Sequence, residues 1–106
     1  MPRYLVKASY TVEGTKGLLK EGGTGRRKAV QQAVEGLGGK LEAFYYAFGE
    51  TDVYGIAEMP DNVSAAAFSL LVAASGAARV TGVVLITPEE IDQATKKATT
   101  YRPPGA

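Results

Sequence analysis

The chain has 106 residues, of which 45% are hydrophobic and 22% charged, so the composition predicts one globular domain rather than a disordered chain. The formal net charge is only +1, and no face is basic enough to supply the many phosphate contacts that nucleic acid binding requires. There is no Cys and no His, which excludes disulfides, Ser-His-Asp and Cys-His catalysis and nearly all transition-metal sites, so we expect neither a metal nor a cofactor.

The first half of the chain predicts a strand and a long helix. Residues 4–11 (YLVKASYT) alternate as a strand does. The following VEGTKGLLKEGGTG is rich in Gly and Lys, which favours a loop with room for one helical turn. From Arg26 the apolar residues recur at helical spacing, so a helix is expected to reach about Gly36, with Thr24 as its candidate cap and Gly38-Gly39 as its stop.

The middle of the chain predicts a hairpin and a second helix. Residues 40–48 (KLEAFYYAF) alternate again, and the short GETD connection leads into a third strand, VYGIAEM. Pro60 ends this strand. Asp61 or Ser64 is the candidate cap of the helix that follows, and Gly76 its stop.

The last segment predicts a strand, ARVTGVVLI, and a terminal helix. Thr87 and Glu90 form a T-x-x-E capping box with Pro88 at the first helical position. The helix is expected over about Pro88 to Ala98.

This order of elements predicts an α+β fold, a ferredoxin-like βαββαβ sandwich with an extra C-terminal helix. Its strand order would be four-one-three-two, with both long helices on one face. Residues 1–98 are expected to form the single domain and residues 99–106 a flexible tail. The N-terminal MPRYLVKASYT is interrupted by Lys7 and Ser9, so it is neither a secretory signal nor a membrane span, and we expect a cytoplasmic protein.

The sheet face that the helices leave uncovered is predicted to be apolar. If Val6, Ala43, Ala57 and Val84 face the helices, the other face carries Leu5, Phe44, Tyr46, Phe48, Tyr54, Ile56, Val83 and Leu85. An apolar patch of that size is usually covered, so we expect a second copy of the chain to pack its own sheet against it. The alternative cover is the C-terminal helix folded back over its own sheet, and the two covers can be combined.

One stretch carries a family resemblance. The segment LGGKLEAFYYAFGETDVYGIAEMPD, with Gly49 and Asp52 in its turn, resembles the GYD domain family of the dimeric α+β barrel superfamily, and the likeness extends from about Tyr10 to Glu90. The resemblance implies the fold and a homodimer or higher homo-oligomer, with no established activity. Family members usually carry Tyr before the Asp, where this chain has Thr51. They also tend to begin the first long helix with a Pro-Lys-Arg type segment, where this chain has GRRK.

Four residues around the central hairpin are candidates for a role. Asp52 opens the third strand beside a Gly turn and is expected to accept backbone N–H bonds, with a ligand-contacting or acid–base carboxylate as the alternative. Gly49 is expected to need an unusual backbone dihedral angle. Lys7 and Glu58 share the uncovered face on neighbouring strands, so we expect them to pair. The pair would either fix subunit registry or give Glu58 a raised pKa suited to proton transfer.

The run GGTGRRK predicts a possible anion site. Arg26, Arg27 and Lys28 lie at a helix start, where cations are unfavourable unless an anion sits among them. The alternative is a solvated basic loop, since the P-loop pattern is absent.

Two functions of different class remain open. The leading interpretation is a non-catalytic homo-oligomer that binds a small ligand or serves as a structural or regulatory accessory, without contacting nucleic acid or membrane. Its candidate ligand-binding residues are Lys7, Tyr10, Tyr46, Phe48 and Arg79. The alternative is a cofactor-independent dimeric α+β barrel enzyme that acts on a small aromatic or polyketide-like substrate between sheet and helices. Its candidate acid–base residues are Glu58, Tyr54 and Asp52, with Arg79 or Lys7 steadying an enolate-like anion.

Overall fold

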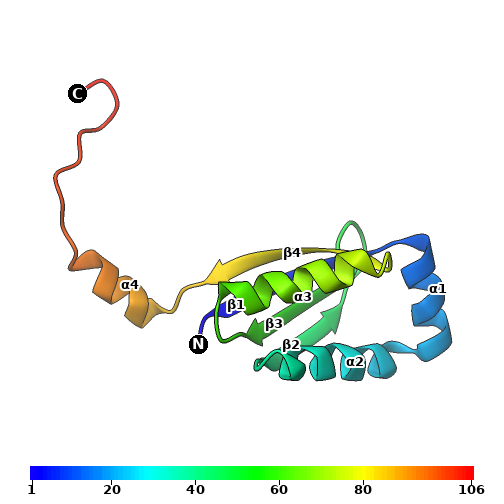
Figure 1. Cartoon of the computed structure of the whole chain (residues 1–106). Coiled ribbons are helices and arrows are strands. Elements are labelled where there is room, and N and C mark those ends of the chain that lie inside the picture. Colours follow the sequence, from blue (N-terminus) through cyan, green and yellow to red (C-terminus); the bar gives the residue numbers. More distant parts are fainter.

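The computed structural model describes all residues, 1–106, and contains four strands and four helices (Figure 1). In chain order the elements are β1 (Arg3–Tyr10), α1 (Val12–Glu21), α2 (Gly23–Gly36), β2 (Lys40–Tyr46), β3 (Val53–Glu58), α3 (Asn62–Ala74), β4 (Ala78–Leu85) and α4 (Pro88–Thr95).

The four strands form one open antiparallel sheet in the order β2-β3-β1-β4. The central strand β1 pairs on both sides, so that Val6 lies opposite Gly55 on β3 and Gly82 on β4. One face carries both long helices, with α2 against β2 and α3 against β4 (Figure 1). The predicted α+β class and strand order are confirmed, and the arrangement is consistent with a ferredoxin-like sandwich.

Helix α1 corrects the prediction of a loop after the first strand. The hydroxyl of Thr11 accepts a hydrogen bond from the Gly14 N–H at 3.2 Å and caps the helix start. Gly14 is buried because α1 lies close against the chain that enters β4: a Cβ at this position would be 1.9 Å from the carbonyl oxygen of Ala77. Gly22, with φ of +83°, then separates α1 from α2. The glycines of this segment therefore serve packing and a turn, and they do not prevent the helix.

The ends of α2 and α3 follow local signals. Gly38 and Gly76 follow these helices with φ of +85° and +76°, as expected for helix stops. Asp61 caps α3, since its carboxylate accepts the Ser64 N–H at 2.8 Å, and this bond lowers the pKa of Asp61. Thr24 was wrongly expected to cap α2, which begins at Gly23 without a side-chain cap.

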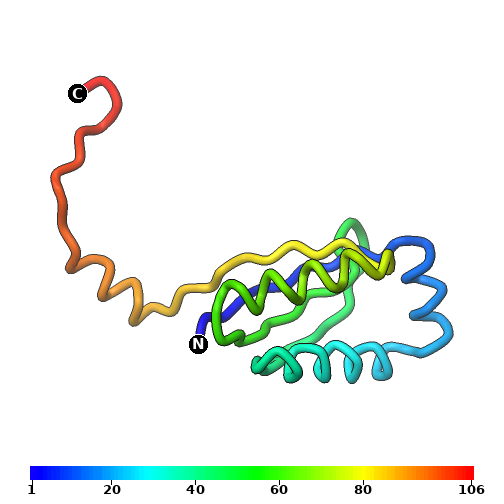
Figure 2. Tube along the Cα trace, viewed as in Figure 1, coloured from blue at the N-terminus to red at the C-terminus, as the bar shows by residue number.

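Helix α4 begins at the predicted capping box and ends at Thr95, three residues short of the predicted end. The Thr87 N–H donates to the Glu90 carboxylate at 2.9 Å, the Glu90 N–H donates to the Thr87 hydroxyl at 3.1 Å, and the first bond lowers the pKa of Glu90. The helix and the tail behind it point away from the sheet (Figure 2). The alternative in which this helix covers its own sheet is therefore wrong.

A β-bulge in β2 changes which side chains face the helices. The register with β3 shifts between Leu41 and Ala43, so Glu42 is an extra residue on β2. Beyond the bulge, Phe44 and Tyr46 lie opposite helix-facing residues of β3, and Ala43 turns to the other face. The predicted positions of these three side chains were wrong, because a one-residue insertion reverses the alternation.

The sheet face opposite the helices, called here the bare face, has no cover within the chain. Its apolar centre consists of Leu5, Tyr54, Ile56, Val83 and Leu85. Tyr54 and Val83 are 41% and 44% exposed. Phe48 does not belong to this face, because it stands in the hairpin turn and is fully exposed.

The core of the single chain is small. Only 8 of the 106 residues are buried, and the radius of gyration is 17.0 Å. A compact domain of this length would have a radius of about 13 Å. The projecting α4 and tail account for part of this excess (Figure 2). The single chain therefore gains little burial and leaves many large apolar side chains exposed.

The close contact at Gly14 gives a direct test of the fold. We expect Gly14→Ala to lower the free energy of unfolding by about 1–3 kcal/mol, because the new methyl group must displace the backbone of Ala77. Gly17, in the same helix, has no atom within 4 Å of its would-be Cβ, so Gly17→Ala should raise stability by up to about 1 kcal/mol. Urea unfolding measures both values, and equal stability changes would contradict this packing of α1.

Candidate functional site

A cavity of about 90 Å³ lies between the sheet and the two long helices. Its walls come from α2 and α3, and its floor from all four strands. Apolar side chains make up most of the lining: Tyr4, Val6, Ala8, Tyr10, Val30, Val34, Leu41, Phe44, Val53, Ala57, Met59, Ala65, Phe68, Val72, Ala78 and Val80. The remaining lining residues are Arg26, Gly55, Ser69 and Gly82. Such a cavity suits an apolar ligand body with few polar groups.

The cavity exists because the strands present small residues to the helices. Ala8, Ala57 and two glycines, Gly55 and Gly82, stand on the floor where larger side chains would fill the space. A Cβ built at Gly82 would meet no atom within 4 Å. The missing side chains leave room that α2 and α3 do not close, since each packs chiefly on an outer strand.

Tyr10 and Arg26 form the polar end of the cavity, and Tyr46 lies beside them. Tyr10 ends β1 and Arg26 lies in the first turns of α2, and both line the cavity. The neighbouring Tyr46 ends β2, and its hydroxyl donates a hydrogen bond to the Gly23 carbonyl at 3.0 Å. The ring of Phe44 meets that of Tyr46 edge to face at 5.3 Å. The end of β2 is thereby attached to the start of α2.

Tyr46 is a poor proton acceptor or donor near neutral pH. The pKa of Tyr46 is raised to about 12, mainly by desolvation and secondly by the neighbouring Tyr10, while Arg26 and Arg27 lower it. Tyr46 therefore stays a neutral hydroxyl, suited to hydrogen bonding rather than to acid–base catalysis.

Asp52 holds Tyr10 in place. Its carboxylate accepts the Tyr10 N–H at 2.8 Å, and its own N–H donates to the Ala8 carbonyl at 2.9 Å. The expectation that Asp52 accepts backbone N–H groups is therefore met, with its donor on β1. Gly49, with φ of +109°, has the expected unusual dihedral angle. The turn thus fixes the end of β1 that carries one cavity-lining tyrosine.

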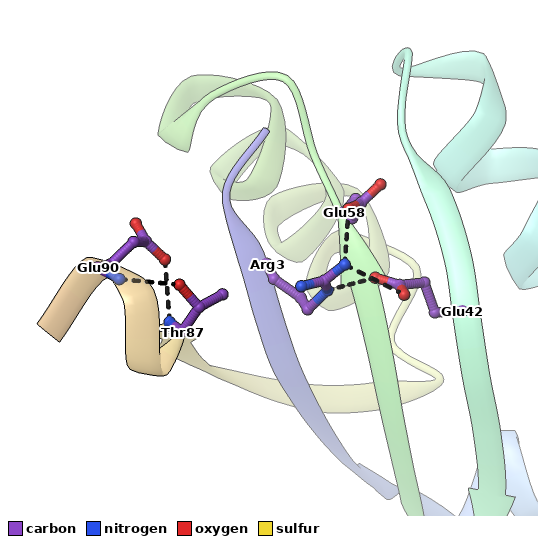
Figure 3. Close-up of polar contacts among 5 residues, drawn as sticks. All are labelled: Arg3, Glu42, Glu58, Thr87 and Glu90. Carbon is purple, nitrogen blue, oxygen red and sulfur yellow. Dashed lines mark hydrogen bonds and ion pairs between the residues drawn. The ribbon is translucent and has the colours of Figure 1, made fainter. Parts of the chain in front are cut away.

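The expected Lys7–Glu58 pair is wrong, although both residues lie on the bare face. In the register of β1 and β3, Arg3 stands opposite Glu58, whereas Lys7 stands opposite Tyr54. Arg3 donates to Glu58 at 2.9 Å and to the bulge residue Glu42 at 2.6 Å (Figure 3). Glu42 is also the main reason that the pKa of Arg3 is raised.

This three-residue cluster of Arg3, Glu42 and Glu58 was not found from the sequence. It joins β1, β2 and β3 at one end of the bare face (Figure 3). All three side chains are partly exposed, so the cluster specifies strand register more than it adds stability. Only the register brings these residues together, and no local sequence motif signals it.

The structure separates the other candidate residues. Arg26 lines the cavity and pairs with Glu21 at 3.3 Å. Arg27 borders a separate open hollow with Tyr45 and Tyr46, and Lys28 lines neither, so the three cations do not surround one point. The bare face carries Lys7, Tyr54, Glu58 and Arg79. Of the candidate ligand-binding residues, only Tyr10 lines the cavity, with Tyr46 next to it.

The fold and the cavity define a small α+β domain with an apolar site between sheet and helices. The family model of the GYD domain matches residues 4–95, and the chain belongs to this family. No curated protein and no solved structure matches the chain. None of the helices combines the length and apolar character needed to cross a membrane.

The raised pKa of Tyr46 predicts a loss of stability at alkaline pH. Since the folded protein holds this proton more tightly, the stabilisation is complete below the ordinary tyrosine pKa of 10.0 and is lost as pH rises toward about 12. Urea unfolding at about pH 9 and about pH 11 should show a smaller alkaline loss for Tyr46→Phe than for the parent. Tyr45→Phe, at a residue 71% exposed, is the control and should match the parent. Equal losses in all three proteins would contradict the desolvated hydroxyl.

Proposed function

We propose that this GYD-domain protein is a homo-oligomeric accessory domain that binds a small apolar ligand in the cavity between its sheet and helices. The observation that carries the proposal is the cavity, whose lining includes a single charged residue. Preformed apolar cavities with few polar groups are the usual small-molecule sites of proteins. The size limits the ligand: an engineered apolar cavity of about 150 Å³ accepts benzene, so this smaller one, which opens to solvent, holds part of a short chain whose remainder reaches the opening.

Homo-oligomerisation is supported by the bare face. The apolar centre of that face has no cover in its own chain, because α4 points away from it (Figure 2). A second copy placed face to face would bury Leu5, Ile56 and Val83 from both chains, as in the dimeric α+β barrel that the family resemblance implies. The cytoplasmic location expected from the sequence belongs to the same proposal.

The enzyme alternative gains no support from this geometry. Glu58 and Tyr54 project from the opposite side of the sheet to the cavity, and Glu58 is engaged by Arg3. The cavity holds no carboxylate, and the neighbouring Tyr46 keeps its proton at neutral pH. A polyketide-like substrate would also exceed the available volume.

Filling the cavity should abolish ligand binding without harming the fold. Gly82→Leu places a side chain in the open floor, so we expect chemical-shift changes on titration with hexan-1-ol to disappear, and the free energy of unfolding to rise by about 1 kcal/mol. Gly36, at the end of α2, also has an open Cβ position but lies outside the cavity, so Gly36→Leu is the matched control and should bind normally. A parent protein that binds no hexan-1-ol would overturn the ligand-binding proposal.

Charging the bare face should dissociate the oligomer. Ile56→Lys would bury unpaired ammonium groups in a face-to-face interface, so the association constant should fall by at least about tenfold. Val12→Lys, at a residue that is 71% exposed and belongs to α1 rather than to the sheet, is the control. Sedimentation equilibrium at micromolar concentration measures the masses. A monomeric parent, or unchanged association of Ile56→Lys, would refute this interface.

A further inference from the structure

We infer that the ligand of the cavity is a small monocarboxylate, with its carboxylate bound by Arg26 and its apolar body lying over the central strands. The inference rests on the proposed function and names the ligand class for the same site. It differs from the anion site predicted at Arg26, Arg27 and Lys28, because it uses only one of these cations together with the apolar floor beside it.

Charge complementarity is the first argument. Among the 20 lining residues Arg26 is the only charged one, and the lining contains no acid. A cation beside an apolar cavity favours an anionic ligand group, because the attraction is strengthened where water is partly excluded. A neutral ligand would form no charge-assisted bond with Arg26, and a cationic ligand would be repelled by it.

The second argument is the hydrogen-bonding capacity of Arg26. Its guanidinium carries five N–H donors, of which only one, on Nη1, donates to a protein acceptor, the Glu21 carboxylate at 3.3 Å. That pair is exposed at the surface and longer than a strong charge-assisted bond. The donors on Nη2 and Nε remain free to bind a carboxylate in the two-bond geometry that arginine favours.

Tyr10 and Tyr46 lie near Arg26, where the polar end of the cavity adjoins its apolar part. Tyr10 lines the cavity, and the Tyr46 hydroxyl, already donated to the Gly23 carbonyl, keeps the start of α2 close to the sheet. Arg26 lies one turn beyond Gly23, and its own N–H donates to the Gly22 carbonyl at 3.2 Å. The backbone of Arg26 is thus held at the start of α2, beside this end of the cavity.

The third argument is the shape of the space beyond Arg26. The floor there is formed by Ala8, Gly55 and Gly82, and the volume of about 90 Å³ accepts a narrow body only. A short unbranched chain satisfies both the volume and the absence of polar partners deeper in the cavity. Hexanoate therefore represents the ligand class, and hexan-1-ol is its neutral counterpart.

The test is calorimetric titration of the full chain with hexanoate, hexan-1-ol and inorganic phosphate. We expect the parent to bind hexanoate at least about tenfold more tightly than hexan-1-ol, as a charge-assisted two-bond contact predicts, and to bind phosphate no better than hexan-1-ol. Arg26→Met should remove the preference for hexanoate and leave the affinity for hexan-1-ol unchanged. Arg26→Lys, which keeps the charge but not the planar fork, should fall between the two.

Lys20→Met is the control for loss of one positive charge, because Lys20 is exposed on α1 and does not line this cavity. It should keep the hexanoate preference within about twofold, since exposed charges at a distance are screened. Circular dichroism on each variant verifies folding, and Arg26→Lys keeps the test valid if Arg26→Met unfolds.

The outcomes separate the two proposals. If hexan-1-ol binds and hexanoate has no advantage, or if Arg26→Met retains that advantage, the carboxylate inference is wrong while the apolar site stands. If phosphate binds as tightly as hexanoate, Arg26 serves a general anion site and the inference is also wrong. If none of the probes binds the parent, the proposed function fails together with it.

Discussion

Small residues on the helix side of β1, β3 and β4 determine how the helices of this domain can pack on the sheet. With Ala8, Gly55 and Gly82 on the helix side of the sheet, the volume needed for a filled core is missing. Helices α2 and α3 pack chiefly on the two outer strands, and a cavity of about 90 Å³ remains between them and the sheet. An empty apolar space costs the fold stability through lost van der Waals contacts. A ligand that fills it would recover these contacts, which explains how a site can arise from packing alone.

The bulge at Glu42 determines how the two faces of the sheet differ. Without the extra residue, Phe44 and Tyr46 would project into the bare face, and the cavity would lose its aromatic wall. The extra residue, Glu42, also directs its own carboxylate toward Arg3. One local irregularity thus supplies both an aromatic side of the cavity and a polar cluster that holds the strands in register. Bulges of this kind are commonly found where a sheet must redirect side chains for function.

The sequence predicts those features that depend on neighbouring residues. Strand alternation, helical periodicity, the Asp61 cap of α3 and the capping box of α4 are signalled within a few positions, because the bonds concerned join residues close in the chain. Predictions from the sequence are wrong where contacts between residues distant in the chain determine the structure. From the sequence, Gly14 suggests an interruption of helical structure, whereas in the structure it allows close contact with Ala77. The bulge cannot be recognised from the β2 sequence alone, because it is an extra residue relative to β3. The partner of Glu58 depends on register, so neither it nor the cavity between helices and sheet can be derived from spacing.

The two proposed roles of the sheet are physically separable. Along β1 the side chains alternate, so Tyr4 and Val6 contribute to the cavity while Leu5 between them contributes to the bare face. Loss of a partner from the bare face would remove no atom from the cavity lining, and filling the cavity would add none to the bare face. The backbone of β1 is shared by both faces, and Arg3 and Asp52 fix it near its two ends. Association could therefore affect ligand binding only by changing the position of this strand, which its pairing with both β3 and β4 opposes.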